Sequence, residues 1–282
     1  MAEGSSGETM TTIDTGTDQV LCDLKDGVAT LTLNRPEARN ALSDTLTPAL
    51  RRMIKSLGED PKVGCLVITG MGRAFCAGGD VKGMAGGSKP ERTLDEAAAD
   101  LKQRQRTLTG ALMALRIPTI AALPGPAAGA GLALALACDI RIAARTAFVT
   151  AGYARVGLSG DYGINWLLTR LVGTAKAREL MFTADMIDAE TCERIGLVNR
   201  VVDDEELQER AFALAHDLAS GPRQAIAYMK DNLDHALTSD FLSALDQEAD
   251  LLVRAVRTAD HKEAARAFVE KRRPRFGAQD DA

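Results

Sequence analysis

The 282-residue chain has little histidine, no closely spaced pair of cysteines and few aromatic residues. Its three histidines, His216, His235 and His261, all lie in the last quarter of the chain. That distribution argues against a histidine metal cluster and against a Ser-His-Asp triad. The five cysteines are far apart and contain no CxxC pair. A disulfide framework and a zinc site are therefore disfavoured, and a reducing, cytoplasmic environment is expected.

A basic surface and a targeting segment are also missing. The 34 lysines and arginines are scattered among 39 acidic residues, for a net charge of −5, which disfavours a nucleic-acid partner. Residues 1–18 are small, polar and acidic, without the apolar stretch of a signal peptide, so we expect a disordered lead-in. The uncharged stretch 118–138 contains three prolines and three glycines, which favours a strand, a turn and a buried helix over a membrane span.

The sequence does contain the alternation of strands and helices that is typical of an α/β core. Two runs rich in β-branched residues, Val20–Leu24 and Val28–Leu33, flank an Asp-Gly turn and predict a hairpin. Apolar residues at helical spacing predict a helix over 42–57, with Pro48 near its first turn. The apolar run 64–70 is bounded by glycines and predicts a buried strand. This order indicates ββα units in a mixed α/β core.

Later segments extend the pattern. Thr93 and Glu96 form the signature of a capping box, and the helix behind it has one predicted apolar face. That face comprises Leu94, Ala97, Leu101, Leu108, Leu112 and Leu115. From Asp203 onward the pattern is helical. We therefore divide the chain into the lead-in, a core over 19–202 and a helical region over 203–282.

Two glycine-rich turns are candidates for chemistry. One is FCAGGD at 75–80, and the other is PGPAAGAG at 124–131. Glycines let the backbone approach a ligand closely, and a helix beginning near Ala130 presents free N–H groups. Two such turns can direct main-chain donors at one oxygen, as an oxyanion hole does. The alternative is that both are tight turns needed for packing. Neither turn has a dinucleotide or P-loop fingerprint.

Six segments in this order resemble the enoyl-CoA hydratase/isomerase (crotonase) superfamily. They are NRPEARNAL (34–42), GRAFCAGGDVKGM (72–84), GPAAGAGLALALACDIRIA (125–143), VGLSGDYGINWLLTRLVG (156–173), CERIGLVNRVV (192–202) and FVEKRRPRF (268–276). The resemblance implies a crotonase-like spiral of ββα units with a C-terminal helical oligomerisation region, forming trimers or hexamers. It also implies an acyl-CoA thioester as the substrate. Coenzyme A is then part of the substrate, and neither a separate cofactor, a metal, a nucleic acid nor a membrane is expected.

The resemblance assigns roles to particular residues. Family members stabilise an enolate-like anion with two backbone N–H groups, which correspond here to Gly79 and Ala130. Arg39 and Lys82 are candidates for phosphate contact. The full set expected at the substrate comprises Ala38, Arg39, Asn40, Ala77, Gly78, Asp80, Val81, Lys82, Pro126 and Ala133.

The sequence departs from the hydratase pattern at the acid/base positions. The two glutamates of the hydratases are replaced by Ala133 and by the acid-free stretch Phe148–Gly152. Asp161 lies where some isomerase branches place their single carboxylate, and one carboxylate suffices for a proton transfer from C2 to C4. Alternatively, Asp161 caps the helix that follows it. The sequence favours isomerase-type chemistry, and the alternative is a catalytically silent acyl-CoA-binding or assembly protein of the same fold.

Overall fold

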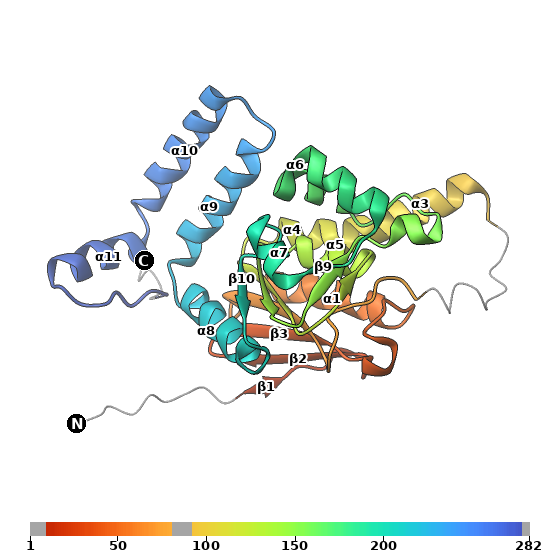
Figure 1. The fold of residues 1–282 in the computed structure, drawn as a ribbon. Coiled ribbons are helices and arrows are strands. Elements are labelled where there is room, and N and C mark those ends of the chain that lie inside the picture. The colour runs from red at the N-terminus through yellow and green to blue at the C-terminus, as the bar shows by residue number, and fades with distance from the viewer. Residues whose placement is uncertain (1–9, 81–91, 278–282) are drawn as a thin grey trace.

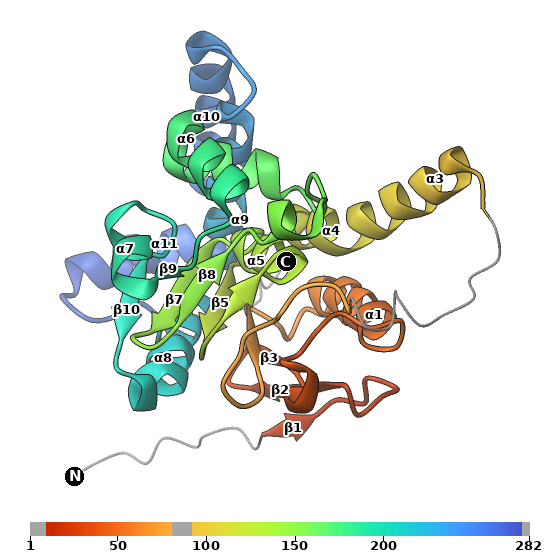
Figure 2. The same ribbon diagram turned by 45° about the vertical axis from the view of Figure 1, so that its right-hand side comes forward.

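The structure is a computed structural model that describes residues 10–80 and 92–277. It is a mixed α/β fold with a seven-stranded sheet in the order β1-β2-β3-β4-β5-β7-β10 and a three-stranded sheet in the order β6-β8-β9 (Figures 1 and 2). The strands are β1 (Thr11–Thr12), β2 (Val20–Lys25), β3 (Val28–Leu33), β4 (Cys65–Gly70), β5 (Thr119–Leu123), β6 (Ala127–Ala128), β7 (Ile140–Ala144), β8 (Phe148–Thr150), β9 (Ile187–Asp188) and β10 (Arg200–Val202).

Helices connect and cover these strands. The α-helices are α1 (Leu46–Glu59), α3 (Leu94–Gln105), α4 (Ala111–Ala114), α5 (Ala130–Leu136), α6 (Ile164–Thr183), α7 (Ala189–Arg194), α8 (Leu207–Ala219), α9 (Arg223–Ala236), α10 (Phe241–Ala255) and α11 (Ala259–Val269). Shorter helical segments are η1 (Pro36–Ala38), η2 (Arg106–Gly110), η3 (Tyr153–Val156) and η4 (Asp204–Glu206).

The predicted hairpin is confirmed. Strands β2 and β3 pair antiparallel, with Val20 opposite Leu33. At the turn between them, Asp26 and Gly27 both have positive φ values, +50° and +75°. Two positive φ values are what a tight hairpin turn requires, which explains the Asp-Gly signal in the sequence.

The parallel part of the sheet lies at the centre of the core. Strands β3, β4, β5, β7 and β10 run parallel, and every residue of β4 and β5 is buried. Burial on both faces explains why these strands have continuous apolar runs instead of alternation. Helix α1 buries Leu50 and Ile54. Pro48 is its third residue, and a proline is tolerated there because the first N–H groups of a helix have no acceptor within it. The predicted helix and the buried strand at 64–70 are thus confirmed.

The prediction for the helix at 94–115 is right about its start and wrong about its apolar face. The capping box is formed, with Glu96 N–H donating to Thr93 Oγ1 and Thr93 N–H donating to Glu96. However, α3 buries none of its residues, and Leu94 is 90% exposed. Burial begins only at Leu108, in η2, and continues at Leu112 in α4. The reason is that α3 projects away from the sheets, so nothing in the described part of the chain covers it (Figures 1 and 2).

The C-terminal helices divide differently from the expected boundary at residue 202. Helix α8 packs directly on β3, β4, β5 and β7, and buries Leu207, Ala211, Ala215 and Ala219. By contrast, α10 buries no residue and α9 buries only Lys230. In Figure 1, α9 and α10 lie side by side away from the sheet, with α11 beyond them. Helix α8 is therefore part of the core, and the separate helical region begins at α9.

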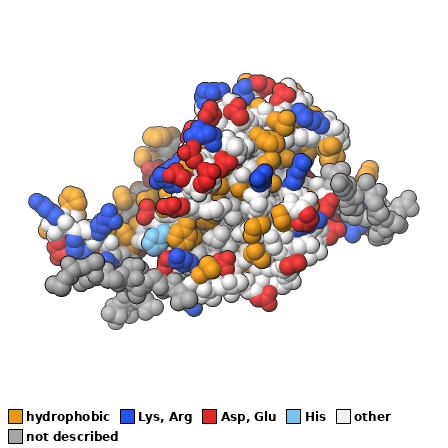
Figure 3. All heavy atoms as spheres, turned by 60° about the horizontal axis from the view of Figure 1, so that its bottom comes forward, with side chains coloured by type: hydrophobic (Ala, Val, Ile, Leu, Met, Phe, Trp, Pro, Cys, Tyr) orange, Lys and Arg blue, Asp and Glu red, His pale blue; other side chains and the backbone are white. Residues whose placement is uncertain are grey.

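The stretch 118–138 does not form a single span. It contains β5, β6 and α5 in succession, as predicted, and no helix among the described residues has the length and apolarity needed to cross a membrane. On the face shown in Figure 3, acidic and basic side chains are interspersed.

Helix α5 packs very closely against the preceding glycine-rich turn. A Cβ atom at Gly131 would lie 2.3 Å from the carbonyl oxygen of Cys76 and 2.7 Å from its Sγ. Real Cβ atoms do not approach a backbone oxygen this closely, so only glycine permits the contact. Gly131 therefore fixes the separation between α5 and the turn at 75–80.

We predict that Gly131→Ala lowers the free energy of unfolding by about 2 kcal/mol, because the added methyl group forces α5 away from Cys76. The matched control is Gly110→Ala. That glycine has an ordinary helical φ, and the nearest atom to an added Cβ is 3.5 Å away. The free energy of unfolding of this control variant is expected to rise by about 0.5–1 kcal/mol. Chemical denaturation of both variants measures the difference, and equal stability of the two would contradict the packing argument.

Candidate active site

The two glycine-rich turns are joined by backbone hydrogen bonds. Cys76 N–H donates to the Pro126 carbonyl at 3.2 Å, and Ala128 N–H donates to the Cys76 carbonyl at 2.9 Å. These bonds form a parallel bridge between Cys76 and Ala127. Cys76 and Ala127, which are 51 residues apart in the sequence, thus lie side by side, three residues before Gly79 on one turn and three before Ala130 on the other.

Gly79 and Ala130 each present a free amide. Neither N–H donates to any other group within residues 10–80 and 92–277. Ala130 is the first residue of α5, where a helix has no acceptor of its own. A Cβ at Gly78 would lie 3.5 Å from the Ala130 nitrogen, so the chain just before Gly79 lies against the second amide. The two predicted donors therefore belong to touching turns, and neither has an acceptor within the described residues.

The loop at 38–40 closes on the first turn, as expected for two segments of one site. Ala77 N–H donates to the Arg39 carbonyl at 2.9 Å, and Leu42 N–H donates to the Gly78 carbonyl at 2.8 Å. Arg39 is exposed, whereas Ala38 and Ala77 are partly buried.

One residue of this loop has a different role from the one expected. Asn40 is fully buried, and its amide group donates to the Ala74 and Met71 carbonyls at 2.8 and 3.0 Å. Its side-chain oxygen accepts from Arg35 N–H at 2.8 Å. All of its polar groups are used in holding the loop, because a buried amide must satisfy its hydrogen bonds within the protein. The Asn40 side chain therefore does not line a channel.

Asp161 is paired with Tyr153. The Tyr153 hydroxyl, at the start of η3, donates to Asp161 Oδ1 at 2.5 Å. The alternative interpretation of Asp161 as a helix cap is wrong, because the N-cap of α6 is Gly163 and no side chain caps that helix. The Asp161 side chain is thus not engaged in holding α6.

Burial sets the protonation of this pair. It raises the pKa of the Asp161 carboxyl above its ordinary value, and the hydrogen bond from Tyr153 opposes that rise. Burial, together with the hydrogen bond to Asp161, raises the pKa of the Tyr153 phenol well above its usual value. Tyr153 therefore remains the protonated donor, and Asp161 is a stronger base than an exposed aspartate.

The Tyr153–Asp161 pair lies next to the second turn. A Cβ at Gly129 would lie 3.8 Å from Tyr153 Cζ and 3.9 Å from its hydroxyl oxygen. Gly129 directly precedes the free amide of Ala130. No motif predicts this pairing, since Tyr153 and Asp161 are separated by two glycines and an exposed loop whose path a single sequence does not determine.

The remaining candidates are placed as follows. The Asp80 carboxylate accepts from Arg35 Nη2 at 3.2 Å, Pro126 is partly buried, and Ala133 is fully buried within α5. Val81 and Lys82 lie outside the described residues. Cys76, although close to the turns, is fully buried and burial raises its pKa to about 12, so its thiol stays protonated.

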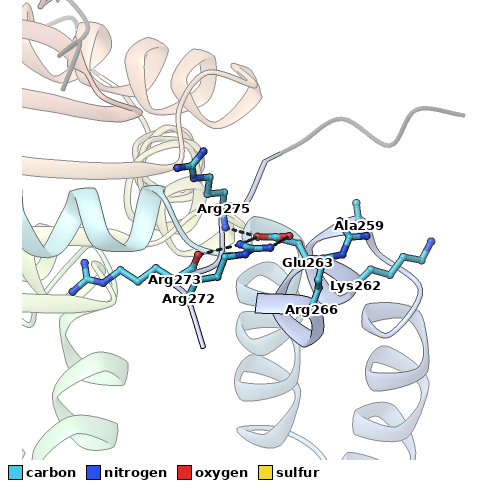
Figure 4. A pocket seen from close by; sticks show the side chains of 7 residues that line it. All are labelled: Ala259, Lys262, Glu263, Arg266, Arg272, Arg273 and Arg275. Carbon is cyan, nitrogen blue, oxygen red and sulfur yellow. Dashed lines mark hydrogen bonds and ion pairs between the residues drawn. The ribbon is translucent and has the colours of Figure 1, made fainter. Parts of the chain in front are cut away.

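A polar hollow lies near the C-terminal end of the chain, away from the two glycine-rich turns. It is lined by Ala259, Lys262, Glu263, Arg266, Arg272, Arg273 and Arg275 (Figure 4). Glu263 holds the Arg272 guanidinium with both carboxylate oxygens, at 2.5 and 3.0 Å, and also accepts from Arg275 N–H at 3.0 Å. These bonds fix the C-terminal segment against α11. Over the described ranges, no group of three or more histidine, cysteine, aspartate or glutamate side chains is arranged to hold a metal ion.

Known proteins resemble the chain over almost its whole length. The enoyl-CoA hydratase/isomerase family matches residues 23–279. The 1,2-epoxyphenylacetyl-CoA isomerase of Escherichia coli (strain K12) is 37% identical over 91% of this chain and 97% of its own length. The crotonyl-CoA hydratase of Syntrophomonas wolfei is 34% identical over 92% of this chain and 98% of its own length.

Solved structures agree with the sequence comparison. The crystal structure of an enoyl-CoA hydratase from Polaromonas sp. JS666 has a TM-score of 0.85 and 32% identity, and it covers 92% of this chain and 99% of the solved one. The crotonase-like fold expected from the six sequence segments is therefore confirmed. The protein belongs to the enoyl-CoA hydratase/isomerase family and is an enzyme of that family acting on an acyl-CoA.

Proposed function

We propose that the protein is an isomerase that moves the double bond of a 3-enoyl-CoA to position 2 through an enolate. The observation that carries this proposal is the partly buried carboxylate of Asp161, oriented by Tyr153 beside the turn that presents the free amide of Ala130. Positions 133 and 148–152, where the hydratases of the family have glutamates, contain no acid. Hydration by the family mechanism requires two acid/base carboxyl groups, whereas the transfer of a proton from C2 to C4 requires one.

In this mechanism Asp161 first acts as a base. Its carboxylate takes a proton from C2, and the electrons of the C2–H bond form a double bond between C1 and C2. The carbonyl π electrons move onto the thioester oxygen, which becomes an enolate oxygen. The same carboxyl group then returns the proton to C4, while the enolate re-forms the carbonyl and a double bond forms between C2 and C3. The step is redox-neutral, and no cofactor takes part.

The two amides stabilise the charged intermediate. Negative charge develops on the thioester oxygen only as C2 loses its proton, so fixed donors at Gly79 and Ala130 stabilise the transition state more than the substrate. One such donor contributes about 3–4 kcal/mol to the barrier reduction. Because the donors belong to the main chain, the alanine side chain at 130 does not weaken them.

The rest of the substrate is expected to follow the loop at 38–40 and the first turn. Ala38, Ala77 and Gly78 present backbone to the coenzyme A moiety in this proposal, and exposed Arg39 is available to a phosphate group. Two backbone hydrogen bonds, donated by Ala77 N–H and Leu42 N–H, join the loop at 38–40 to the first turn. In this proposal they hold both segments in position for the substrate.

We further propose that the chain works as a homotrimer or hexamer in the cytoplasm. Large apolar side chains are exposed along the C-terminal helices, and a second copy would bury them. They are Met229, Leu233, Phe241, Leu242, Leu252, Val253, Phe268 and Val269. Five buried, unpaired cysteines agree with a reducing compartment. A monomer mass by light scattering would contradict the oligomer.

We predict that Asp161→Asn abolishes the turnover of a 3-enoyl-CoA while binding of the CoA ester is retained, because the amide fills the same space but cannot take a proton. Stopped assays of double-bond position measure turnover, and calorimetric titration measures binding. Turnover at the wild-type rate would remove Asp161 from the mechanism. If wild-type protein binds a panel of acyl-CoAs and releases all of them unchanged, the silent binding protein is the better description.

We predict that Tyr153→Phe moves the acidic limb of the kcat/KM profile to higher pH. Activity requires ionised Asp161, and the Tyr153 hydrogen bond lowers the pKa of that carboxyl, so its removal raises the pKa. Tyr228→Phe, on α9, is the matched control and should leave the limb unchanged. A limb that stays in place or moves to lower pH would refute the positioning role of Tyr153.

A further inference from the structure

The side chain of Arg35, the second residue after β3, joins two segments of the candidate site. Its Nη1 donates to the Ala41 carbonyl at 2.8 Å, and its Nη2 donates to Asp80 Oδ2 at 3.2 Å. The two side chains of this ion pair are only 16% and 29% exposed. Hydrogen bonds between charged groups are stronger when they are partly shielded from water. The Arg35 guanidinium therefore ties the loop before α1 to the end of the first glycine-rich turn.

Gly79 lies between the two hydrogen bonds that pair its turn with Leu42. Leu42 N–H donates to the Gly78 carbonyl at 2.8 Å, and Asp80 N–H donates to the Leu42 carbonyl at 3.3 Å. Because Leu42 bonds to the residues on both sides of Gly79, the Gly79 N–H itself is directed away from Leu42. The bond at 3.3 Å is longer than the usual N–H···O distance of about 3.0 Å. The Arg35–Asp80 ion pair reinforces the same end of this bridge.

The loop at 38–40 needs such support, because two of its residues have an unfavourable backbone conformation. Arg39 and Asn40 have φ values of +50° and +57°. Residues other than glycine keep this conformation only where the surrounding structure holds them. Arg35 contributes through its main chain, since its N–H donates to Asn40 Oδ1 and its carbonyl accepts from Asn40 N–H, both at 2.8 Å. Arg35 thus holds the loop with its backbone and the Gly79 turn with its side chain.

The direction of the Gly79 N–H matters for the proposed function. A backbone donor stabilises an enolate oxygen best when it is already directed at the position where charge develops, so that it does not reorient during the reaction. A small misplacement of such a group lowers the rate strongly. The carboxylate of Asp80, one of the residues expected at the substrate, directly follows Gly79 and is engaged by Arg35. This contact restrains the amide of Gly79 from the next residue along the chain.

We propose that Arg35 and Asp80 are positioning residues: their ion pair fixes the direction of the Gly79 N–H toward the thioester oxygen of the substrate. They act through the Gly79 amide and not by contact with the reacting atoms. The inference rests on the proposed function for the presence of a thioester oxygen at Gly79. Its first test observes that carbonyl directly and requires no turnover.

The first test measures the carbonyl stretch of bound octanoyl-CoA, labelled with ¹³C at the thioester carbonyl, by isotope-edited infrared difference spectroscopy. Hydrogen bonds from the two amides polarise the carbonyl, so wild-type protein should move the stretch to lower frequency than in free octanoyl-CoA. Arg35→Gln should lose about half of that shift, which is the share of one of two donors. A shift of full size in Arg35→Gln would overturn the proposal.

Arg116→Gln is the matched control, because Arg116 also donates to both a backbone carbonyl and a carboxylate. It donates to the Ala114 carbonyl at 3.0 Å and pairs with Asp231 at 2.7 Å. These contacts join the chain after α4 to α9, and neither helix contains a predicted site residue. The control should lower the stability in chemical denaturation and leave the infrared shift unchanged. An equal loss of the shift in both arginine variants would indicate a general structural effect and overturn the positioning role.

A second pair of variants keeps the test decisive if Arg35→Gln does not fold. Asp80→Asn retains a side-chain oxygen that can accept from Arg35, whereas Asp80→Ala removes it. Asp80→Ala should therefore lose the same part of the infrared shift, and Asp80→Asn should retain most of it. Equal shifts in the two Asp80 variants would contradict the proposal.

The kinetic test uses 3-hexenoyl-CoA. Arg35→Gln and Asp80→Ala should lower kcat by about 10–10²-fold, as for a displaced donor, with little change in KM. A rise in KM at unchanged kcat would indicate ordinary substrate binding and overturn the positioning role. If wild-type protein shifts the carbonyl stretch but turns over no 3-enoyl-CoA, the proposed reaction fails and the positioning role stands. If wild-type protein produces no shift, there is no oxyanion hole to position, and both proposals fail.

Discussion

The catalytic geometry depends on the hydrogen bonds that join the turn at 75–80 to the turn at 124–131. Cys76 N–H donates to the Pro126 carbonyl and Ala128 N–H donates to the Cys76 carbonyl, which holds the two turns side by side close to Gly79 and Ala130. The N–H groups of Gly79 and Ala130 have no acceptor within the described residues. Buried amides normally find acceptors inside the protein, so two that do not, on touching turns, support the proposal of an oxyanion hole at this place. Gly131 maintains this arrangement because no larger residue fits against Cys76.

Close to this pair of amides, burial changes the pKa values of Asp161 and Tyr153. The Asp161 carboxyl has a raised pKa because it is withdrawn from water, and the Tyr153 hydroxyl limits the rise and fixes one carboxylate oxygen. In the proposed mechanism the other oxygen takes the substrate proton. The absence of an acid at 133 and at 148–152 supports the proposal of a one-proton transfer over the addition of water.

Much of this fold follows from local sequence signals. The Asp-Gly turn, the glycine-bounded strand 64–70 and the capping box at Thr93 are each formed by residues close together in the chain, so a single sequence specifies them. Burial is harder to predict. The leucines of α3 have helical spacing but face solvent, and α8 packs on the sheet although its pattern resembles that of the helices after it. Which apolar face is covered depends on contacts between distant segments.

In the candidate site too, contacts between distant segments could not be predicted from the sequence. The glycine turns and the family resemblance predict Gly79, Ala130 and Asp161 as site residues, whereas the hydrogen bonds of Asn40 and Tyr153 are seen only in the folded chain. Asn40 looked like a channel residue and is a buried anchor of its loop. The pairing of Tyr153 with Asp161 is not evident from the sequence, because only the fold brings the two side chains together.

The most direct test of the account replaces the amide of Ala130 by an ester, through incorporation of lactate at that position. The substitution deletes one N–H and keeps the methyl side chain. We expect kcat for a 3-enoyl-CoA to fall by about 10²–10³-fold, as for removal of one oxyanion donor. Lactate at position 133 removes an N–H that donates to the Gly129 carbonyl within α5, and it should change kcat much less. An enzyme with lactate at 130 that turns over as fast as the one with lactate at 133 would contradict the oxyanion hole.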